Sequence, residues 1–260
     1  MGRVLCIANQ KGGVGKTTTA VNLAAGLAVA QRRTLLIDID PQGSATSGMG
    51  VRDLGERPTT YDIIMGERAV RDVVLPSQIE HLYVLPAHRD LVGSEVELVS
   101  TLAREYRLKE ALESIRSEYE FLIIDCPPSL GLLTVNGLTS ADGVLIPLQC
   151  EYYAMEGLSA LMDTVNLIRE RLNHELVIEG ILLTMFDTRN SLSHQVCDEV
   201  RKHFPDRVYQ TVIPRNVRVS ESPSHGLPVT VYDPTSKGAQ AYLDLAREMI
   251  TQEADRQSAS

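Results

Sequence analysis

The sequence predicts an α/β domain built on a twisted, mainly parallel sheet of seven to eight strands with helices on both faces. Short apolar runs alternate with longer segments of helical period, as expected for repeated βαβ units. Several of these runs are apolar at successive positions, which is typical of central strands buried on both faces. The 260 residues are 43% apolar and contain neither an internal repeat nor a Pro/Ser-rich linker. We therefore expect one domain over residues 1–251 and a frayed tail over 252–260.

Strands are expected at the short apolar runs, and helices in the segments between them. The expected strands are Val4–Asn9, Thr34–Ile39, Leu82–Pro86, Phe121–Asp125, Gly143–Leu148, Ile178–Met185 and Val208–Ile213. The helical segments are Thr17–Ala30, a stripe of Leu102, Leu108, Leu112 and Ile115, a second stripe of Leu158, Leu161, Met162, Val165, Ile168 and Leu172, and the final helix Tyr242–Ile250. Apolar residues at helical spacing predict that these stripes face the core.

Charge and cysteine usage exclude several classes of protein. The net charge of -9 argues against a chain coated in positive charge, so that any contact with nucleic acid has to be local. No apolar run approaches the roughly 20 residues needed to cross a bilayer. The four cysteines form no zinc motif and are expected to be buried free thiols in a reducing, cytoplasmic compartment: Cys6, Cys126, Cys150 and Cys197. The N-terminus shows no basic leader or signal peptide.

A phosphate-binding loop follows the first strand and leads directly into a helix. Its residues are Lys11, Gly12, Gly13, Val14, Gly15, Lys16, Thr17 and Thr18, a modified form of the motif G-x-x-x-x-G-K-[ST]. Glycines let successive backbone N–H groups face a phosphate, and the helix N-terminus adds a positive dipole end. Lys16 is predicted to contact the β- and γ-phosphate oxygens, and the Thr17 hydroxyl to hold Mg²⁺.

Lys11 departs from the ordinary motif, because it precedes the glycines. A side chain that leaves the loop there is expected to point away from the nucleotide bound by its own backbone. The sequence therefore predicts that two subunits meet face to face over two ATP molecules, with each Lys11 reaching the γ-phosphate of the other subunit. The alternative is a solvent-exposed lysine without a catalytic role.

Three aspartates follow predicted strands and are expected near the phosphate loop. Asp38 and Asp40 are two residues apart at the end of a strand, so both can point to one side. We expect Asp38 to order magnesium-bound water, and Asp40 to orient or deprotonate the attacking water. Asp125 ends an apolar strand, in the manner of a Walker B aspartate that supports the metal. The alternative for all three is capping of the turns that follow.

These motifs together resemble the ParA-type partition ATPases, in particular the chromosomal ParA/Soj group, over almost the whole chain. The resemblance rests on the loop with its signature lysine and on Asp38-Ile39-Asp40-Pro41-Gln42-Gly43, Asp125-Cys126-Pro127-Pro128-Ser129 and Pro214-Arg215-Asn216-Val217-Arg218. It implies a P-loop fold, Mg²⁺-dependent ATP hydrolysis and an ATP-sandwich homodimer. Lys11, Lys16 and Asp40 match the family's catalytic positions, Thr17 and Asp125 its magnesium positions, and Pro214 and Asn216 the residues around adenine.

The resemblance also implies partners. Such a dimer binds double-stranded DNA without sequence preference, associates with the nucleoid when ATP is bound, and is stimulated by a ParB/Spo0J-type centromere-binding protein. Arg189 and Arg218 match positions used to hold DNA; they lie in a stretch, 184–221, of net charge +1 in a chain of net charge -9. Ordinary surface arginines are the alternative. No N-terminal helix-turn-helix extension of the plasmid group is expected.

Three other functions remain open at this stage. A MinD-like membrane-cycling ATPase needs a basic amphipathic helix at its C-terminus, whereas residues 251–260 contain one arginine, two acidic residues and no large apolar residue. An iron–sulfur reductase would use cysteines such as Cys126 and Cys150 to bridge a cluster. A nucleotide-dependent scaffold would bind ATP without hydrolysing it.

Overall fold

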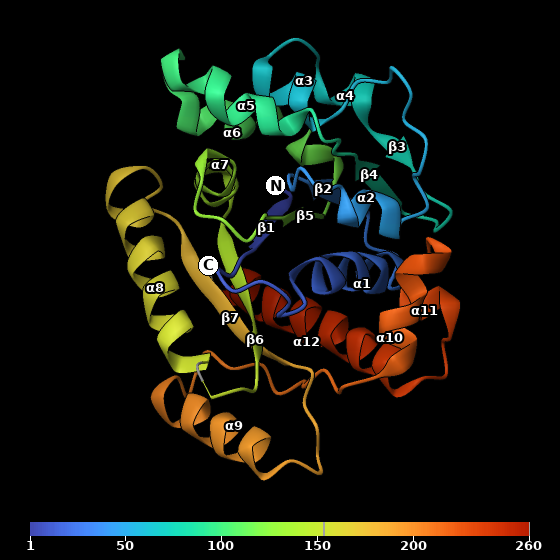
Figure 1. The fold of residues 1–260 in the computed structure, drawn as a ribbon, viewed down its shortest axis with the longest axis vertical. Coiled ribbons are helices and arrows are strands. Elements are labelled where there is room, and N and C mark those ends of the chain that lie inside the picture. The colour runs from blue at the N-terminus through green and yellow to red at the C-terminus, as the bar shows by residue number, and fades with distance from the viewer. Residues whose placement is uncertain (153, 260) are drawn as a thin grey trace.

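The computed structural model describes every residue except Tyr153 and Ser260. Its centre is a seven-stranded sheet, within the described residues, in the order β3-β4-β2-β5-β1-β6-β7 (Figure 1). The strands are β1 (Arg3–Ile7), β2 (Thr34–Asp38), β3 (Leu75–Pro76), β4 (Leu82–Leu85), β5 (Phe121–Asp125), β6 (Gly143–Gln149) and β7 (Val177–Thr184). All neighbouring pairs are parallel except β3 with β4. The predicted α/β class is confirmed.

Helices cover both faces of this sheet (Figure 1). They are α1 (Lys16–Val29), α2 (Ser44–Gly48), α3 (Thr60–Met65), α4 (Val70–Val73), α5 (Leu91–Glu97), α6 (Arg107–Glu113), α7 (Leu132–Ser140), α8 (Ala154–Arg171), α9 (Ser191–His203), α10 (Val217–Glu221), α11 (Val229–Tyr232) and α12 (Lys237–Ala259). Short 3₁₀ turns span Leu98–Ser100, Arg104–Tyr106, Arg116–Glu118 and Ser222–His225. Buried apolar residues of α6, α7, α8 and α9 form the core of one face, and those of α1, α11 and α12 form the core of the other.

The strand expected at Val208–Ile213 does not form. The segment runs beside β7 and makes bridges only near its two ends, at Val208 and Pro214. Between them, the backbone N–H groups of Gln210 and Thr211 donate to the carboxylate of Glu248 on α12, at 2.8 and 2.9 Å. These N–H groups therefore bond to a side chain instead of extending the ladder, which ends the sheet at β7.

Two further expectations about the chain are wrong. Leu102, expected in a core stripe, is 92% exposed, because it precedes α6 and lies outside the helix that buries Leu108 and Leu112. The segment 252–260, expected to fray, continues α12 to Ala259. A polar contact explains this order, since Arg256 pairs with the buried Glu179 of β7 at 2.9 Å.

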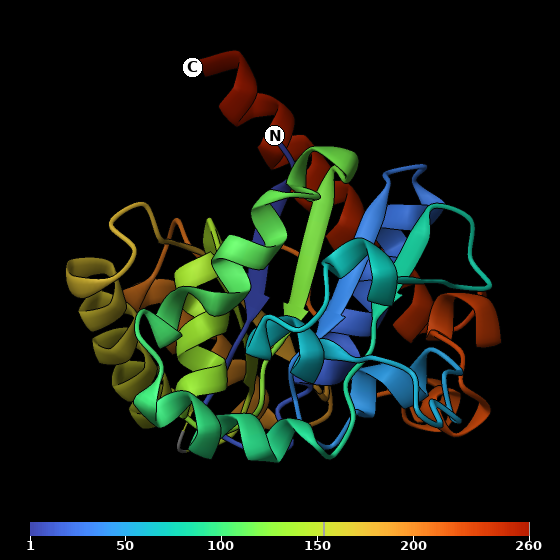
Figure 2. The ribbon, with the colours of Figure 1, turned by 90° about the horizontal axis from the view of Figure 1, so that it is seen from above.

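The order of the strands places the predicted site aspartates at one edge of the sheet and the chain termini at the other. The carboxyl ends of β1, β2 and β5 are neighbours, because β5 lies between β1 and β2 with Asp125 level with Ile7 and Asp38. The chain termini lie at the opposite edge, where the strand arrows begin in Figure 2. None of the helices within the described residues has the length and apolar character needed to span a membrane.

Candidate nucleotide-binding site

The phosphate loop links β1 to α1 in the conformation that the glycine pattern predicts. Gly13 and Gly15 have φ values of 74° and 90°, a left-handed backbone that side chains rarely adopt. The loop is supported from β7, where the Thr184 hydroxyl donates to the Val14 carbonyl at 2.8 Å. A cavity of 250 Å³ opens above it, lined by Gly12, Gly13, Gly15, Lys16, Thr17, Thr18, Asp40, Pro128 and Met185.

Lys16 is buried at the base of this loop. Its ammonium group donates to the Lys11 carbonyl at 3.0 Å. Burial lowers the pKa of Lys16, while the nearby carboxylates of Asp125 and Asp40 act in the opposite direction. The Lys16 ammonium group is thus already partly removed from water in the absence of a phosphate, which suits a group that binds one.

The side chain of Lys11 does not enter the phosphate cavity of its own chain. Its Nζ atom pairs with Glu151 Oε2 at 2.6 Å, just beyond the end of β6. Both side chains are partly exposed, at 39% and 46%. The prediction that this lysine leaves the loop away from its own phosphate site is in accord with this geometry; its reach to a second subunit remains a prediction.

Asp38 and Asp40 lie together, but they make different contacts. The Asp38 carboxylate accepts hydrogen bonds from the backbone N–H and the hydroxyl of Thr46, at 2.8 and 2.7 Å, and from the Asp40 N–H at 3.0 Å. Burial nevertheless raises the pKa of Asp38 to about 6. Asp38 therefore anchors the turn after β2, as the capping alternative expects, and its role in ordering magnesium-bound water stays a prediction. Asp40 lines the phosphate cavity.

Asp125 is the most unusual carboxylate of the chain. It is fully buried, and neither of its oxygens accepts a hydrogen bond of normal geometry from any described residue. Burial raises its pKa well above the usual range, and the neighbouring charge of Asp38 adds to this, whereas the Thr17 hydroxyl lowers it. A buried carboxylate without a partner is costly unless a ligand satisfies it. A magnesium ion with its water shell fits this donor set of Thr17 and Asp125.

A second cavity of 170 Å³ adjoins the first and contains the residues expected around adenine. Its lining includes Pro214 and Asn216, together with Gly15, Thr18 and Met185 of the phosphate side. Asn216 also caps α10, because its Oδ1 accepts the N–H of Arg218 at 2.8 Å. The structure thus brings the predicted phosphate and adenine residues to two cavities that share Gly15, Thr18 and Met185.

The two arginines expected to hold DNA are exposed and line neither cavity. Arg189 is 87% exposed and bonds both oxygens of Asp187 at 3.0 Å. These hydrogen bonds lower the pKa of Asp187 to about 2. Arg218 is 53% exposed and pairs with Glu221 at 3.0 Å and Asp233 at 3.2 Å. Each arginine is therefore already paired with an acidic side chain in the structure.

Two residues of this region escaped the sequence analysis. Met185 lines both cavities and has a φ of 51°, which is unusual for a residue with a side chain. Glu151 is the partner of Lys11. A single sequence carries no signal for either, because a methionine at a strand end and a glutamate in a turn are ordinary.

The cysteines are buried free thiols, as predicted. Cys6 and Cys126 lie with their sulfur atoms 3.0 Å apart between β1 and the end of β5. Among the described residues, no group of three or more His, Cys, Asp and Glu side chains is arranged to hold a metal ion directly.

Comparisons with known proteins identify the family. The model of a family described as "AAA domain" matches residues 2–178. The chain is 57% identical over 249 residues to the sporulation initiation inhibitor protein Soj of Bacillus subtilis, covering 96% of this chain and 98% of Soj. It is 55% identical to the chromosome partitioning protein ParA of Myxococcus xanthus, covering 96% and 88%.

A solved structure with bound ADP and magnesium has the same fold. It is described as cobyrinic acid a,c-diamide synthase from Mycobacterium smegmatis, is 36% identical, covers 95% of this chain and 93% of its own, and superposes with a TM-score of 0.83. The identities to Soj and ParA extend over nearly the whole chain. The chain therefore belongs to the ParA/Soj family of chromosome-partitioning ATPases.

Proposed function

We propose that this ATPase closes with Mg²⁺ and ATP into a face-to-face homodimer that binds DNA without sequence preference and is reset by hydrolysis. In this proposal Lys16 binds the phosphates, Thr17 and Asp125 support the magnesium ion, and Asp40 orients the attacking water. Bound Mg²⁺ would neutralise charge on the phosphates. A ParB-type centromere-binding protein accelerates hydrolysis, and the cycle moves a chromosome or plasmid.

The position of Lys11 is the observation that carries the dimer. Its ammonium lies outside the phosphate cavity and its only described side-chain partner is the partly exposed Glu151. An exposed ion pair of this kind contributes about 0.5 kcal/mol, so exchange of Glu151 for the γ-phosphate of a second subunit is easy. A lysine supplied in trans would then link nucleotide occupancy to association.

DNA binding follows from the dimer for an electrostatic reason. The chain has a net charge of -9, so DNA can be bound only by a local cluster of cations, and two subunits double that cluster. If Arg189 and Arg218 of both subunits contact phosphates, about four ion pairs form, and the logarithm of the DNA affinity falls with the logarithm of salt concentration with a slope of about -3.6. The dimer would associate with the nucleoid only while it holds ATP.

The membrane-cycling alternative receives less support from α12. The apolar side chains of Tyr242, Leu245 and Met249 are buried in the core against α1, and Arg256 is tied to Glu179. A helix that binds lipid needs its apolar face for the bilayer. Pelleting with anionic vesicles and ATP separates the two functions, since the proposed ATPase stays in the supernatant.

The substitution Asp40→Ala tests the proposed cycle. With Mg²⁺ and ATP we expect hydrolysis to stop and the protein to remain on DNA, whereas the wild type dissociates as ATP is consumed. Phosphate release and DNA retention on a sensor surface measure both effects. Asp72→Ala, an exposed aspartate on α4, is the matched control. Normal hydrolysis by Asp40→Ala would show that another group orients the water.

A further inference from the structure

Glu95 on α5 lies directly against the backbone that leads from Asp125 to α7. A side chain on Gly131 would overlap Glu95 Oε1 and approach its Cδ atom to 3.0 Å. The φ of Gly131 is -73°, which any residue adopts, so glycine is required here for the close approach of the carboxylate and not for its backbone conformation.

The carboxylate of Glu95 has an unused acceptor. Its Oε1 atom is buried and accepts no hydrogen bond within the part of the chain that the structure describes. Gly131 is the N-cap of α7 and provides no side-chain cap, while the first N–H groups of any helix lack acceptors within the helix. A carboxylate at a helix N-terminus is favoured by these donors and by the helix dipole. Acceptor and donors therefore lie side by side without bonding.

The segment that connects Asp125 to α7 adjoins the proposed hydrolytic site. Residues 126–131 connect Asp125 to α7, and Pro128 of this segment lines the phosphate cavity. Ser129 is held to α7, since the Thr134 hydroxyl bonds to its carbonyl. A shift of the N-terminus of α7 therefore moves Pro128 relative to the phosphates and changes the surroundings of Asp125.

We propose that Glu95 is a positioning residue for ATP hydrolysis. When nucleotide fills the cavity and Pro128 closes over it, Glu95 Oε1 accepts a backbone N–H at the start of α7, from Gly131 or Leu132, and fixes the segment in its hydrolytic position. Glu95 touches neither nucleotide nor metal. The proposal requires ATP hydrolysis alone and holds whether or not the chain dimerises or binds DNA.

Three variants and a control test this role by steady-state ATP hydrolysis with Mg²⁺. Loss of one charge-assisted hydrogen bond in the hydrolytic conformation lowers kcat by about tenfold, so Glu95→Ala should show this loss with KM for ATP changed less than about twofold. Glu95→Gln keeps an oxygen acceptor and should retain most of kcat. Gly131→Ala displaces the carboxylate and should resemble Glu95→Ala. Glu97→Gln, on the same helix but bonded to Tyr61, should match the wild type.

Hydrogen exchange supplies a readout that does not depend on turnover. In the wild type, Mg²⁺ with a non-hydrolysable ATP analogue should slow exchange of the amides of Gly131 and Leu132, and Glu95→Ala should lose this nucleotide-dependent protection while its thermal midpoint without nucleotide stays close to that of the wild type. Wild-type kcat in Glu95→Ala, equal losses in Glu95→Ala and Glu95→Gln, or an absence of nucleotide-dependent protection in the wild type would each overturn the proposal.

Discussion

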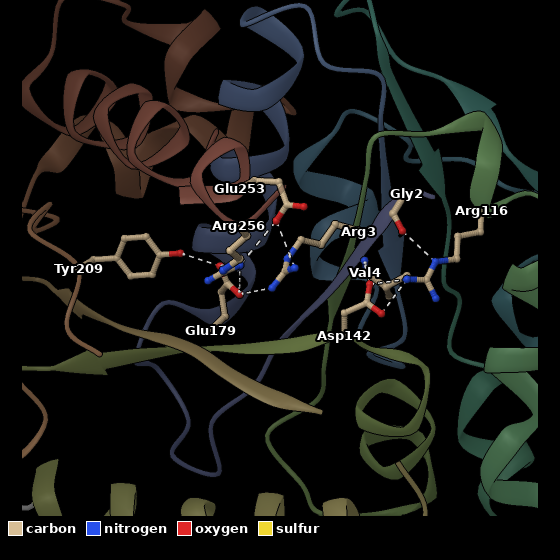
Figure 3. Close-up of polar contacts among 9 residues, drawn as sticks. All are labelled: Gly2, Arg3, Val4, Arg116, Asp142, Glu179, Tyr209, Glu253 and Arg256. Atoms are coloured by element: carbon tan, nitrogen blue, oxygen red, sulfur yellow. Dashed lines mark hydrogen bonds and ion pairs between the residues drawn. The ribbon is translucent and has the colours of Figure 1, made fainter. Parts of the chain in front are cut away.

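Buried carboxylates at the two edges of the central sheet differ in whether they have partners. At the edge where β1 and β7 begin, the Glu179 side chain is 1% exposed and bonds Arg3 at 2.7 Å and Arg256 at 2.9 Å (Figure 3). Nearby, Asp142 pairs with Arg116 and accepts the N–H of Val4. At the other edge, Asp125 is as deeply buried, but neither of its oxygens accepts a hydrogen bond of normal geometry from a described residue.

The difference separates a structural role from a functional one. Paired carboxylates join the N-terminal strand, β7 and the last turns of α12, and so they hold the ends of the chain on the sheet. A buried carboxylate without a partner destabilises the ligand-free protein. Such a group is retained where a bound ligand satisfies it. The edge with the unsatisfied buried carboxyl group is the one that carries the phosphate loop.

Removal of a carboxylate from each edge should have opposite effects on stability. Glu179→Ala leaves Arg3 and Arg256 without their buried partner and should lower the free energy of unfolding by about 3 kcal/mol. Asp125→Asn replaces a buried carboxyl group that accepts no hydrogen bond of normal geometry, and it should leave the nucleotide-free protein as stable as the wild type or more so, while abolishing hydrolysis. Urea unfolding without nucleotide measures both changes.

A surface pair at the structural edge provides the control. Glu120 pairs with Arg32, and both side chains are partly exposed, so Glu120→Ala should cost less than about 1 kcal/mol. If Glu179→Ala and Asp125→Asn destabilise the protein equally, the distinction between the two edges is wrong.

The pH dependence of stability should also reveal the burial of Asp38 at the edge that carries the phosphate loop. The pKa of Asp38 is raised from 3.8 to about 6, chiefly by burial, so the folded protein binds this proton more tightly than the unfolded chain does. The stability of the nucleotide-free wild type should therefore fall as pH rises from about 4 to about 6, by up to about 3 kcal/mol relative to Asp38→Asn. Parallel stability profiles of the two proteins would contradict the shifted pKa.

Release of Lys11 from Glu151 should make ATP-dependent dimer formation easier. Glu151→Gln weakens the ion pair that competes with a partner's phosphate, at about 0.5 kcal/mol per subunit. Two subunits then give about a fivefold larger equilibrium constant for formation of the ATP-bound dimer, which lowers the ATP concentration for half-maximal dimer formation. Glu156→Gln, an exposed glutamate on α8, should leave that concentration unchanged. Light scattering across an ATP titration makes the comparison, and an unchanged midpoint in Glu151→Gln would mean that the pair does not compete.

The smallest effect is expected on the surface proposed for DNA. Asp187→Asn removes the negative charge that bonds Arg189 and should strengthen binding of the ATP-bound protein to double-stranded DNA by about threefold at low salt, with the gain disappearing at high salt. Asp198→Asn makes the same change of net charge at an exposed position of α9. Equal gains in the two variants would place Arg189 outside the DNA-binding surface.

Sequence patterns were sufficient for the phosphate loop and for the strands β1, β2, β4, β5, β6 and β7, whereas the two-residue strand β3 was not expected. Strand, glycines, lysine and helix follow one another locally in the chain, so their order fixed the geometry around Lys16. The strand expected at Val208–Ile213 failed because Glu248, distant in sequence, captures two of its N–H groups. The order of the last turns of α12 depended in the same way on a distant partner, Glu179.

The partners of the site residues were beyond the sequence for a related reason. Glu151 is 140 residues from Lys11, and Glu95 is also distant in sequence from Gly131, so no periodic pattern links the two members of either pair. Burial without a partner, the feature that distinguishes Asp125, is likewise a property of the folded chain. Motifs predicted candidate residues for the chemistry, whereas the structure was needed to see which of them already have hydrogen-bond or ion-pair partners.

The central claim is that Lys11 of one subunit completes the phosphate site of another. Light scattering with Mg²⁺ and a non-hydrolysable ATP analogue tests it most directly, on the wild type and on Lys11→Ala at equal concentration. The account predicts a dimer of the 28.6 kDa wild-type chain with the analogue and a monomer without it, and a monomer under both conditions for Lys11→Ala, which still binds the analogue. A wild type that remains monomeric when saturated with the analogue, or a Lys11→Ala variant that dimerises as well as the wild type, would contradict it.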